Sequence, residues 1–92
     1  MQYEWDPKKA EANFRKHRVS FVEATTVFHD PLAVTFDDPE HSLGEHRYIT
    51  IGKSTAGRSL FVAIAERGDR IRIISARRAT RREVHGYQEG KF

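Results

Sequence analysis

Three consecutive segments of the sequence have the composition of β-strands and are joined by very short connections. Residues 47–53 (RYITIGK), 58–67 (RSLFVAIAER) and 70–77 (RIRIISAR) are rich in β-branched and aromatic side chains. The connecting stretches STAG and GD contain glycine, as hairpin connections typically do. Because hairpins join antiparallel neighbours, the sequence predicts an antiparallel meander, to which LAVTF (32–36) adds a fourth strand.

Two helices are expected before the meander. Asp6 is suited to cap the first helix, and Pro7 is suited to its first turn because the missing N–H is not needed there. Ser20 and Glu23 have the spacing of a capping box, so the second helix should begin there and run to Phe28. The aromatic tripeptide YEW in front of both helices alternates in polarity and can form a short edge strand.

The last segment (79–92) is expected to form a third helix. Thr80 and Glu83 give a second capping-box pattern, and Gly90 is placed to end the helix. The polar stretch DDPEHSLGEH before the meander is expected to be a loop. This order of elements predicts an α+β fold, in which a curved antiparallel sheet of about four strands carries two N-terminal helices and one C-terminal helix.

Length and composition exclude several kinds of protein. The 92 residues are enough for one small domain, which we expect to span 1–92. The absence of cysteine excludes disulfides and thiolate metal sites. The longest apolar run, LFVAIA, is far shorter than the roughly 20 residues of a membrane span, and the N-terminus has no apolar signal region. We therefore expect a soluble cytoplasmic protein that does not associate with membranes.

The positive charge is concentrated in the second half of the chain. Residues 1–57 contain seven Lys and Arg against nine Asp and Glu, whereas residues 58–92 contain nine against four. Eight of the eleven arginines lie between Arg58 and Arg82. Such an arginine-rich half is suited to a phosphate-rich partner, because the guanidinium group binds phosphate in a bidentate manner. The alternative is an ordinary solvated basic surface.

Four arginines follow the last predicted strand, where the last helix should begin. They lie in the stretch RIISARRATRRE and are Arg77, Arg78, Arg81 and Arg82. Cations in the first turn of a helix oppose the helix dipole by roughly 0.3–1 kcal/mol each. Their presence therefore favours an anion bound at the free amides of the helix start. The alternative is pairing with carboxylates from elsewhere in the chain, for which Glu23, Asp30 and the acidic loop are candidates.

Further arginines lie within the strands themselves. Arg70 and Arg72 alternate with Ile71 and Ile73, so the arginines share one face of the strand and the isoleucines share the other. Arg58 begins the preceding strand and is expected nearby. These side chains are candidates for phosphate contact. The alternative is that they are ordinary solvent-exposed residues at a sheet edge.

Few side chains are suited to proton transfer. His17 lies on the same helical stripe as Phe14, and histidine is a residue type suited to acid–base work, although a histidine at a helix end can instead cap the last carbonyls. Tyr87 can stack on a base, donate a proton or pack on the sheet. His41 and His46 belong to the acidic loop, but their spacing matches no standard metal-ligand pattern. We therefore expect no metal site.

These motifs together resemble the BrnT family of bacterial toxins. The matching segments are WDPKKAEANFRKHRVSFVEA, a DP dipeptide, RYITIG and RIISARRATRRE, followed by Tyr87. They are collinear and span nearly the whole chain, and their combination is far more specific than any single piece. One departure is Arg18, where the family more often has the glycine that ends the first helix.

The resemblance implies a fold similar to that of RelE-type ribonucleases and a metal-independent endoribonuclease that inhibits translation without a cofactor. The implied partners are an RNA substrate and a cognate ribbon-helix-helix antitoxin of the BrnA type, and operator DNA would be bound only through that antitoxin. The residues alone leave two alternatives open. One is a non-catalytic basic module that binds nucleic acid or protein, and the other is a purely structural partner subunit.

The resemblance also ranks the candidate site residues. Arg77 and Arg81 match the two arginines of the family motif S-A-R-x-A-T-R and are the strongest catalytic candidates. The remaining candidates for an acid or a base are His17, Glu83 and Tyr87. The alternative for Glu83 is that it only caps the helix. The candidates for binding RNA phosphates are Arg58, Arg72 and Arg82.

Overall fold

The computed structural model describes residues 2–41 and 44–89. Its elements, in chain order, are β1 (Gln2–Glu4), α1 (Pro7–His17), α2 (Phe21–Thr25), the 3₁₀-helix η1 (Thr26–His29), β2 (Val34–Asp37), the 3₁₀-helix η2 (Pro39–His41), β3 (Arg47–Lys53), β4 (Ser59–Arg67), β5 (Arg70–Arg78) and α3 (Arg81–Glu89). Gly90, which was expected to end the last helix, lies outside the described residues, as do residues 42–43 of the predicted loop.

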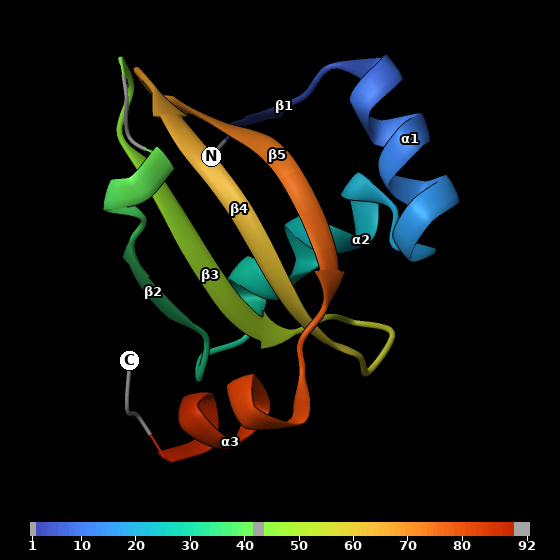
Figure 1. Cartoon of the computed structure of the whole chain (residues 1–92), viewed down its shortest axis with the longest axis vertical. Coiled ribbons are helices and arrows are strands. Elements are labelled where there is room, and N and C mark those ends of the chain that lie inside the picture. The colour runs from blue at the N-terminus through green and yellow to red at the C-terminus, as the bar shows by residue number, and fades with distance from the viewer. Residues whose placement is uncertain (1, 42–43, 90–92) are drawn as a thin grey trace.

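The five strands form one sheet in the order β1-β5-β4-β3-β2 (Figure 1). Strands β2 to β5 are the predicted antiparallel meander. The N-terminal strand β1 joins the sheet as an edge strand and runs parallel to β5, so the sheet as a whole is mixed. The predicted α+β class, with two N-terminal helices and one C-terminal helix, is confirmed.

Both N-terminal helices begin at the residues that their caps predict. The Asp6 carboxylate accepts a hydrogen bond from the N–H of Lys8 at 2.8 Å, and Ser20 Oγ accepts one from the N–H of Glu23 at 2.9 Å. These bonds satisfy N–H groups that have no partner inside the helix. The second helix tightens after Thr25, so the single helix expected there is α2 followed by η1.

Arg18 ends α1 in a left-handed backbone conformation, with a φ of 58°. Its N–H donates to the carbonyl of Phe14 at 2.8 Å. Because this conformation costs an L-residue roughly 1–2 kcal/mol, glycine suits the position better. Two contacts offset part of the cost: the guanidinium carbon of Arg18 lies 5.9 Å from the Phe14 ring centroid, and the Arg18 carbonyl accepts a hydrogen bond from Arg58 at 3.0 Å.

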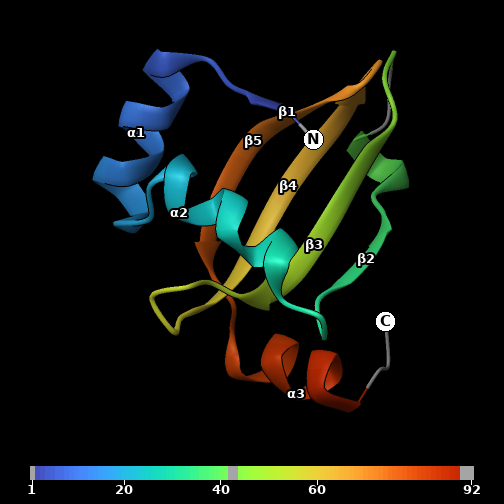
Figure 2. The same cartoon turned by 180° about the vertical axis from the view of Figure 1, so that it is seen from behind.

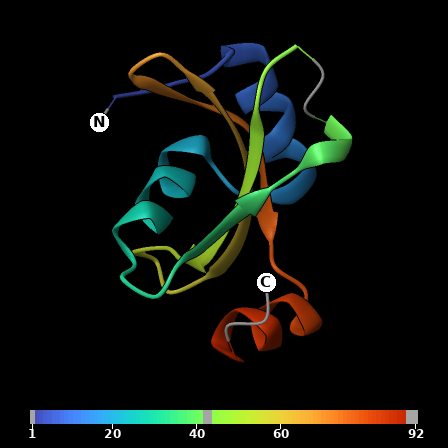
Figure 3. The ribbon, with the colours of Figure 1, turned by 90° about the vertical axis from the view of Figure 1, so that its left-hand side faces the viewer.

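The two faces of the sheet carry separate apolar clusters. Helix α2 and η1 lie against one face, seen in Figure 2, whereas α3 lies at one end of the sheet, as Figure 3 shows. The buried residues of the first cluster are Val19, Phe21, Ala24, Val27, Leu60, Val62, Ile64, Ile73 and Ala76. Those of the second are Ile49, Ile51 and Tyr87, with Phe36, Phe61 and Ala63 packed against them. We call the first surface the helix-covered face and the second the open face.

Asn13 joins α1 to the outer edge of β5. Strand β1 pairs only with residues 70–72 of β5, so the edge beyond them needs other hydrogen-bond partners. The buried side chain of Asn13 donates to the carbonyl of Ala76 at 2.8 Å and accepts from its N–H at 3.1 Å. It also donates to the carbonyl of Val19 at 3.0 Å. One amide group thereby closes a strand edge and fixes the end of α1.

A β-bulge in β5 decides which face the C-terminal arginines occupy. Ile64 opposes Ile73 but Ala63 opposes Ser75, so Ile74 has no cross-strand partner. Strict alternation would put Arg77 on the same face as Ile73. The extra residue reverses the alternation, so Ala76 packs in the helix-covered cluster and Arg77 points to the open face beside its cross-strand partner Phe61.

Candidate functional site

Arg77 is held in one orientation on the open face. Its Nη1 and Nη2 donate to Oε1 and Oε2 of Glu83 at 2.8 and 2.9 Å. Its guanidinium carbon lies 4.0 Å from the centroid of the Phe61 ring, at cation–π distance. The hydrogen bonds with Glu83 raise the pKa of Arg77, and those with Arg77 lower the pKa of Glu83, more strongly than burial opposes either change. Both groups are therefore ionised at neutral pH.

The same glutamate caps the last helix. Glu83 Oε1 accepts a hydrogen bond from the N–H of Thr80 at 2.8 Å, and Thr80 Oγ1 accepts one from the N–H of Glu83 at 3.2 Å. The predicted capping box is thus closed in both directions. Because Glu83 belongs to α3 and Arg77 to β5, the start of the helix and the orientation of the guanidinium are fixed by one carboxylate.

The other arginines of the cluster divide between the two faces. Arg81 and Arg82 are exposed in the first turn of α3, and no ion pair neutralises either one within the described residues. Arg78 lies opposite Leu60, a residue of the helix-covered cluster, and therefore belongs to that face. Arg72 is half-buried opposite Ala65 on the open face. The open face therefore collects Arg77 and Arg72, with Arg81 and Arg82 at its α3 end.

Arg58 is paired with a carboxylate from the chain itself. Its Nε donates to Glu23 Oε2 at 2.9 Å, and its Nη2 contacts Glu23 Oε1. Ser54 Oγ donates to the same carboxylate at 2.7 Å. The hydrogen bond from Arg58 is the main reason why the pKa of Glu23 is lowered, and that from Ser54 adds to it against the opposing effect of burial. Glu23, which was named as a possible partner of the arginines at residues 77–82, thus pairs with Arg58 instead.

Tyr87 and Asp30 anchor the other end of α3. The Tyr87 hydroxyl donates to Asp30 Oδ2 at 2.5 Å. Burial, together with this bond, raises the pKa of Tyr87 to about 12. Burial would raise the pKa of Asp30, but hydrogen bonds from Tyr87 and from the N–H groups of Lys53 and Leu32 outweigh it and lower that pKa. Tyr87 is buried with Ile51, which is the packing role that its position on the helix allowed.

His17 occupies the last turn of α1 and is half-buried. In the part of the chain that the structure describes, it makes no hydrogen bond or ion pair with the arginine cluster. The histidines of the acidic loop are paired locally, His41 with Asp38 at 2.9 Å and His46 with Asp37 at 3.2 Å. Within residues 2–41 and 44–89, no group of three or more His, Asp or Glu side chains is arranged to hold a metal ion.

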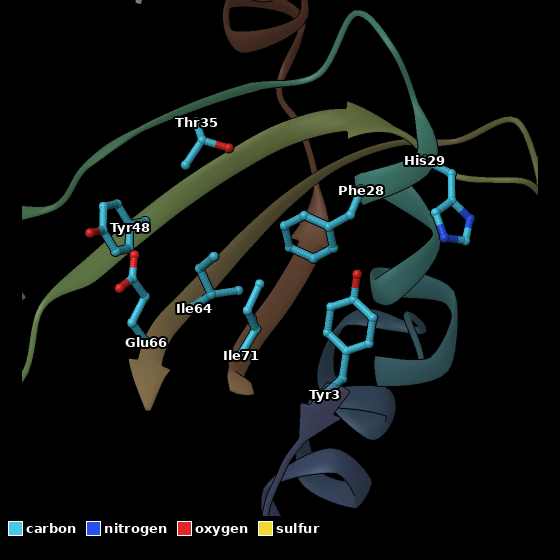
Figure 4. Close-up of a pocket in the computed structure, with 8 residues that line it drawn as sticks. All are labelled: Tyr3, Phe28, His29, Thr35, Tyr48, Ile64, Glu66 and Ile71. Atoms are coloured by element: carbon cyan, nitrogen blue, oxygen red, sulfur yellow. The ribbon is translucent and has the colours of Figure 1, made fainter. Parts of the chain in front are cut away.

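A cavity of about 510 Å³ lies on the helix-covered face, away from Arg77. Figure 4 shows Tyr3 and Phe28 on one side of it, Tyr48 and Glu66 on the other, and Ile64 between them. Among the described residues that line it, Glu66 is the only carboxylate and none is a lysine or an arginine. An RNA phosphate would meet negative charge and apolar surface there, so this cavity is not suited to bind a nucleic-acid backbone.

Sequence reasoning missed three features of the site region. Asn13 is an unremarkable polar residue on an amphipathic helix, and nothing in its neighbourhood indicates that it contacts Ala76. The pairing of Glu23 with Arg58 joins residues far apart in the chain. Phe61 has the sequence signal of an ordinary strand residue.

None of the helices among the described residues is long and apolar enough to cross a membrane.

The sequence matches, over residues 5–83, the family model described as "Ribonuclease toxin, BrnT, of type II toxin-antitoxin system". Among solved structures, the fold is similar to that of the Brucella abortus ribonuclease toxin BrnT, with a TM-score of 0.70 and 23% sequence identity. That alignment covers 88% of this chain and 99% of the Brucella chain. Because the sequence identity is only 23%, this similarity shows a shared fold and nothing more. Comparison with curated proteins gives no match.

Proposed function

Because the chain belongs to the BrnT family of ribonuclease toxins of type II toxin–antitoxin systems, we propose that its open face cleaves RNA around the guanidinium of Arg77. Family membership implies endoribonuclease activity, an RNA substrate and an antitoxin partner. The observation that carries the assignment to this face is the position of Arg77, fixed by Glu83 and Phe61 on a surface that α3 covers only at one end.

The chemistry proposed is transesterification by the RNA itself. The 2′-hydroxyl loses its proton to a base and attacks the neighbouring phosphorus, and the bond from phosphorus to the 5′-oxygen breaks as that oxygen gains a proton. The products are a 2′,3′-cyclic phosphate and a 5′-hydroxyl. The nucleophile is part of the substrate, so the protein must supply orientation, proton transfer and positive charge for the extra charge of the transition state.

Arg77 is suited to supply that charge. Its Nη1 donates to Glu83 and to the carbonyl of Arg78, the latter at 3.2 Å, and its Nη2 donates once to Glu83. A guanidinium has five N–H groups, so Nε–H and one N–H of Nη2 are left for a phosphate oxygen. Pre-oriented donors of this kind stabilise a transition state without reorganising.

Glu83 is assigned as the residue that positions Arg77. Its pKa is lowered by Arg77, which makes it a weak base near neutrality. Arg81, exposed in the first turn of α3, is proposed as the second catalytic cation, and Arg72 and Arg82 as contacts for neighbouring phosphates. Arg58 is the weakest phosphate candidate, because Glu23 and the Arg18 carbonyl engage its donors.

His17 and Tyr87 differ in their fitness for proton transfer. The hydrogen bond from Tyr87 to Asp30 and its pKa of about 12 support a structural role. His17 is the remaining candidate among the residues named for proton transfer, and an imidazole can act as a base or an acid, so we retain it. A folded His17→Ala variant that cleaves RNA with an unchanged rate and pH profile would remove it from the mechanism.

We also propose a ribbon-helix-helix antitoxin of the BrnA type that covers or displaces the arginines of the open face, with operator DNA bound only through that antitoxin. The motif S-A-R-x-A-T-R and the exposed cations of α3 support this choice. Co-expression with a small gene directly downstream should restore growth and co-purify with the chain. A complex that leaves Arg77 and Arg81 accessible and unchanged would contradict the inhibitory mode.

The decisive experiment is induced expression in a bacterial host, with growth and RNA 5′ ends followed over time. Wild type should arrest growth and generate new 5′ ends, whereas Arg77→Ala and Arg81→Ala should lose most of this cleavage. Arg15→Ala is the matched control, because Arg15 is an exposed arginine of α1 that pairs with Glu11. Circular dichroism of each purified variant verifies that it is folded.

Two results would contradict the proposal. If wild type neither slows growth nor cuts RNA in the presence of ribosomes, the chain is a binding module without catalysis. If Arg77→Ala is folded and fully toxic, the active centre lies elsewhere. We further infer that residues 1–92 form one toxin domain in the cytoplasm, for which a single unfolding transition would be the first test.

A further inference from the structure

A second cavity opens on the same face as Arg77. It has a volume of about 380 Å³ and extends over four strands. Its floor is one row of direct cross-strand neighbours, in which Phe36 opposes Ile49, Ile49 opposes Ala63, and Ala63 opposes Ser75. In Figure 1, none of the α-helices α1, α2 and α3 lies in front of β3 and β4, and η2 contributes His41 to the lining of the cavity.

This row lies directly beside the row that ends in Arg77. The neighbouring row runs from Val34 through Ile51 and Phe61 to Arg77. Two residues along a strand separate the rows, which is about 6.6 Å. Phe61 links the two, because its ring contacts the Arg77 guanidinium and also lines the cavity. A nucleotide with its phosphate at Arg77 therefore has this cavity within reach of its own base or of the next.

The lining combines an aromatic and aliphatic floor with a polar rim. The half-buried rings of Phe36 and Phe61 and the side chain of Ile49 supply apolar surface. The polar lining residues are Asp37, Asp38, His41, Arg47 and Ser75. This composition resembles the way proteins hold an unpaired base, with stacking on aromatic rings and hydrogen bonds to the base edge.

We propose that this cavity binds one nucleobase of the RNA next to the cleaved phosphate and that it prefers guanine. A carboxylate accepts hydrogen bonds from the adjacent N1–H and N2–H₂ donors of guanine, and an arginine donates to its O6 and N7 acceptors. Asp38, which also pairs with His41, and Arg47, which also pairs with Glu45, bring both kinds of group to the lining of this cavity. The inference rests on the proposed ribonuclease function and adds to it the residues that select the cleavage site.

The contrast with the cavity of Figure 4 supports a base of the substrate as the occupant. That cavity lies on the face opposite Arg77, and its described lining residues include the carboxylate of Glu66 but neither lysine nor arginine. The cavity on the open face shares Phe61 with the Arg77 site and has Arg47 in its wall. A base attached to a bound phosphate is thus delivered to the second cavity and not to the first.

The test compares Phe36→Leu with Phe28→Leu. Both replace a half-buried phenylalanine by an aliphatic side chain that keeps most of the apolar volume, but Phe28 lines the cavity on the helix-covered face. Cleavage sites are mapped from RNA 5′ ends after induction of each variant. Wild type and Phe28→Leu should show guanine enriched at one fixed position within a nucleotide of the cut. Phe36→Leu should cut with roughly tenfold weaker enrichment, the loss expected for one stacked base.

A binding measurement covers the case in which Phe36→Leu does not cut. Titration of purified wild type with guanosine 5′-monophosphate, followed by nuclear magnetic resonance, should shift the signals of Ile49 and Ala63 more strongly than adenosine 5′-monophosphate does. Phe36→Leu should lose this difference and Phe28→Leu should keep it. Absence of guanine enrichment in wild type, or a Phe36→Leu variant that cuts RNA with the wild-type map, would overturn the proposal.

Failure of this inference is distinguishable from failure of the ribonuclease assignment. If Arg77→Ala abolishes cleavage but Phe36→Leu leaves the site preference unchanged, the result supports the active centre at Arg77 and contradicts the base pocket. If wild type cuts no RNA at all, both fall together.

Discussion

Two arginine–glutamate pairs in this molecule begin from the same local motif and serve different ends. In both, the glutamate stands three residues after a Ser or Thr that caps a helix. Glu83 binds Arg77, six positions away, and Glu23 binds Arg58, 35 positions away. The side chains are similarly accessible, with 35% and 19% exposure for the Arg77 pair and 28% and 15% for the Arg58 pair.

The pairs differ in where the carboxylate is used. Glu83 closes its capping box and accepts from the N–H of Thr80 while holding Arg77. Glu23 accepts from Arg58 and Ser54 and so ties α2 to the β3–β4 connection. The Arg77–Glu83 pair holds a cation on the open face, whereas the Arg58–Glu23 pair connects α2 to the β3–β4 connection. A capping pattern in the sequence therefore predicts the start of a helix but not the use of its glutamate.

The largest expected effect separates the two arginines by activity. Arg77→Lys keeps the charge but loses the bidentate geometry, so cleavage should fall on the order of 10²- to 10³-fold, as when an oriented donor is removed from a transition state. Arg58→Lys should leave cleavage within a few fold of wild type. Cleavage rates of a defined RNA with ribosomes measure both. Equal losses of cleavage in the two variants would show that the two arginine–glutamate pairs do not differ in function.

The next effect separates the two glutamates by stability. Glu23→Gln weakens hydrogen bonds from Arg58 and Ser54 inside a partly buried corner and should lower the free energy of unfolding by about 2 kcal/mol. Urea denaturation measures this change. The variant should retain cleavage, because Arg77 is untouched. A stable but inactive Glu23→Gln variant would instead place Arg58 in the catalytic site.

Glu23 also makes the free energy of unfolding depend on pH. The pKa of Glu23 is lowered in the folded state from the ordinary value of 4.5. Its contribution to stability is therefore fully present above about pH 5 and is lost as the pH falls below 4.5. Unfolding free energies measured from pH 7 to pH 3 should fall less steeply for Glu23→Gln than for wild type. Parallel curves would show that the Arg58 pair contributes nothing to stability.

A smaller effect concerns the anchor of α3. Tyr87→Phe removes the hydroxyl that donates to Asp30 and should cost about 1.5 kcal/mol of unfolding free energy, since the acceptor is charged. Cleavage should persist, with α3 looser at its C-terminal end. Thermal unfolding and the RNA assay are read together. A Tyr87→Phe variant of wild-type stability that no longer cleaves RNA would make Tyr87 catalytic.

The smallest effect is stabilising. Arg18→Gly relieves the left-handed backbone at the end of α1, and should raise the unfolding free energy by up to about 1 kcal/mol. The gain is limited because the contact of Arg18 with Phe14 is lost. Arg18→Ala is the control, since alanine keeps the strain and loses the same contact. A destabilised Arg18→Gly would mean that this side chain matters more than its backbone.

Much of the fold was predictable because its signals are local. The meander follows from β-branched runs and short connections, and residues 47–53 form a strand with the predicted bounds. Asp6, Ser20 and Thr80 each cap the helix that follows them, because a cap is a bond between residues two or three positions apart. The family prediction is confirmed by the match over residues 5–83. The catalytic roles of the arginines stay a prediction.

What only the tertiary structure decided involves contacts between distant residues. The bonds of Asn13 to Ala76 and of Tyr87 to Asp30 join positions that no sequence period relates. The bulge at Ile74 leaves no mark in the composition of β5, yet it moves Arg77 from the core side of the strand to the open face. The sequence by itself determined that arginines gather where β5 meets α3. Which of them lies on the open face depends on one unpaired residue, because every strand position after a bulge changes sides.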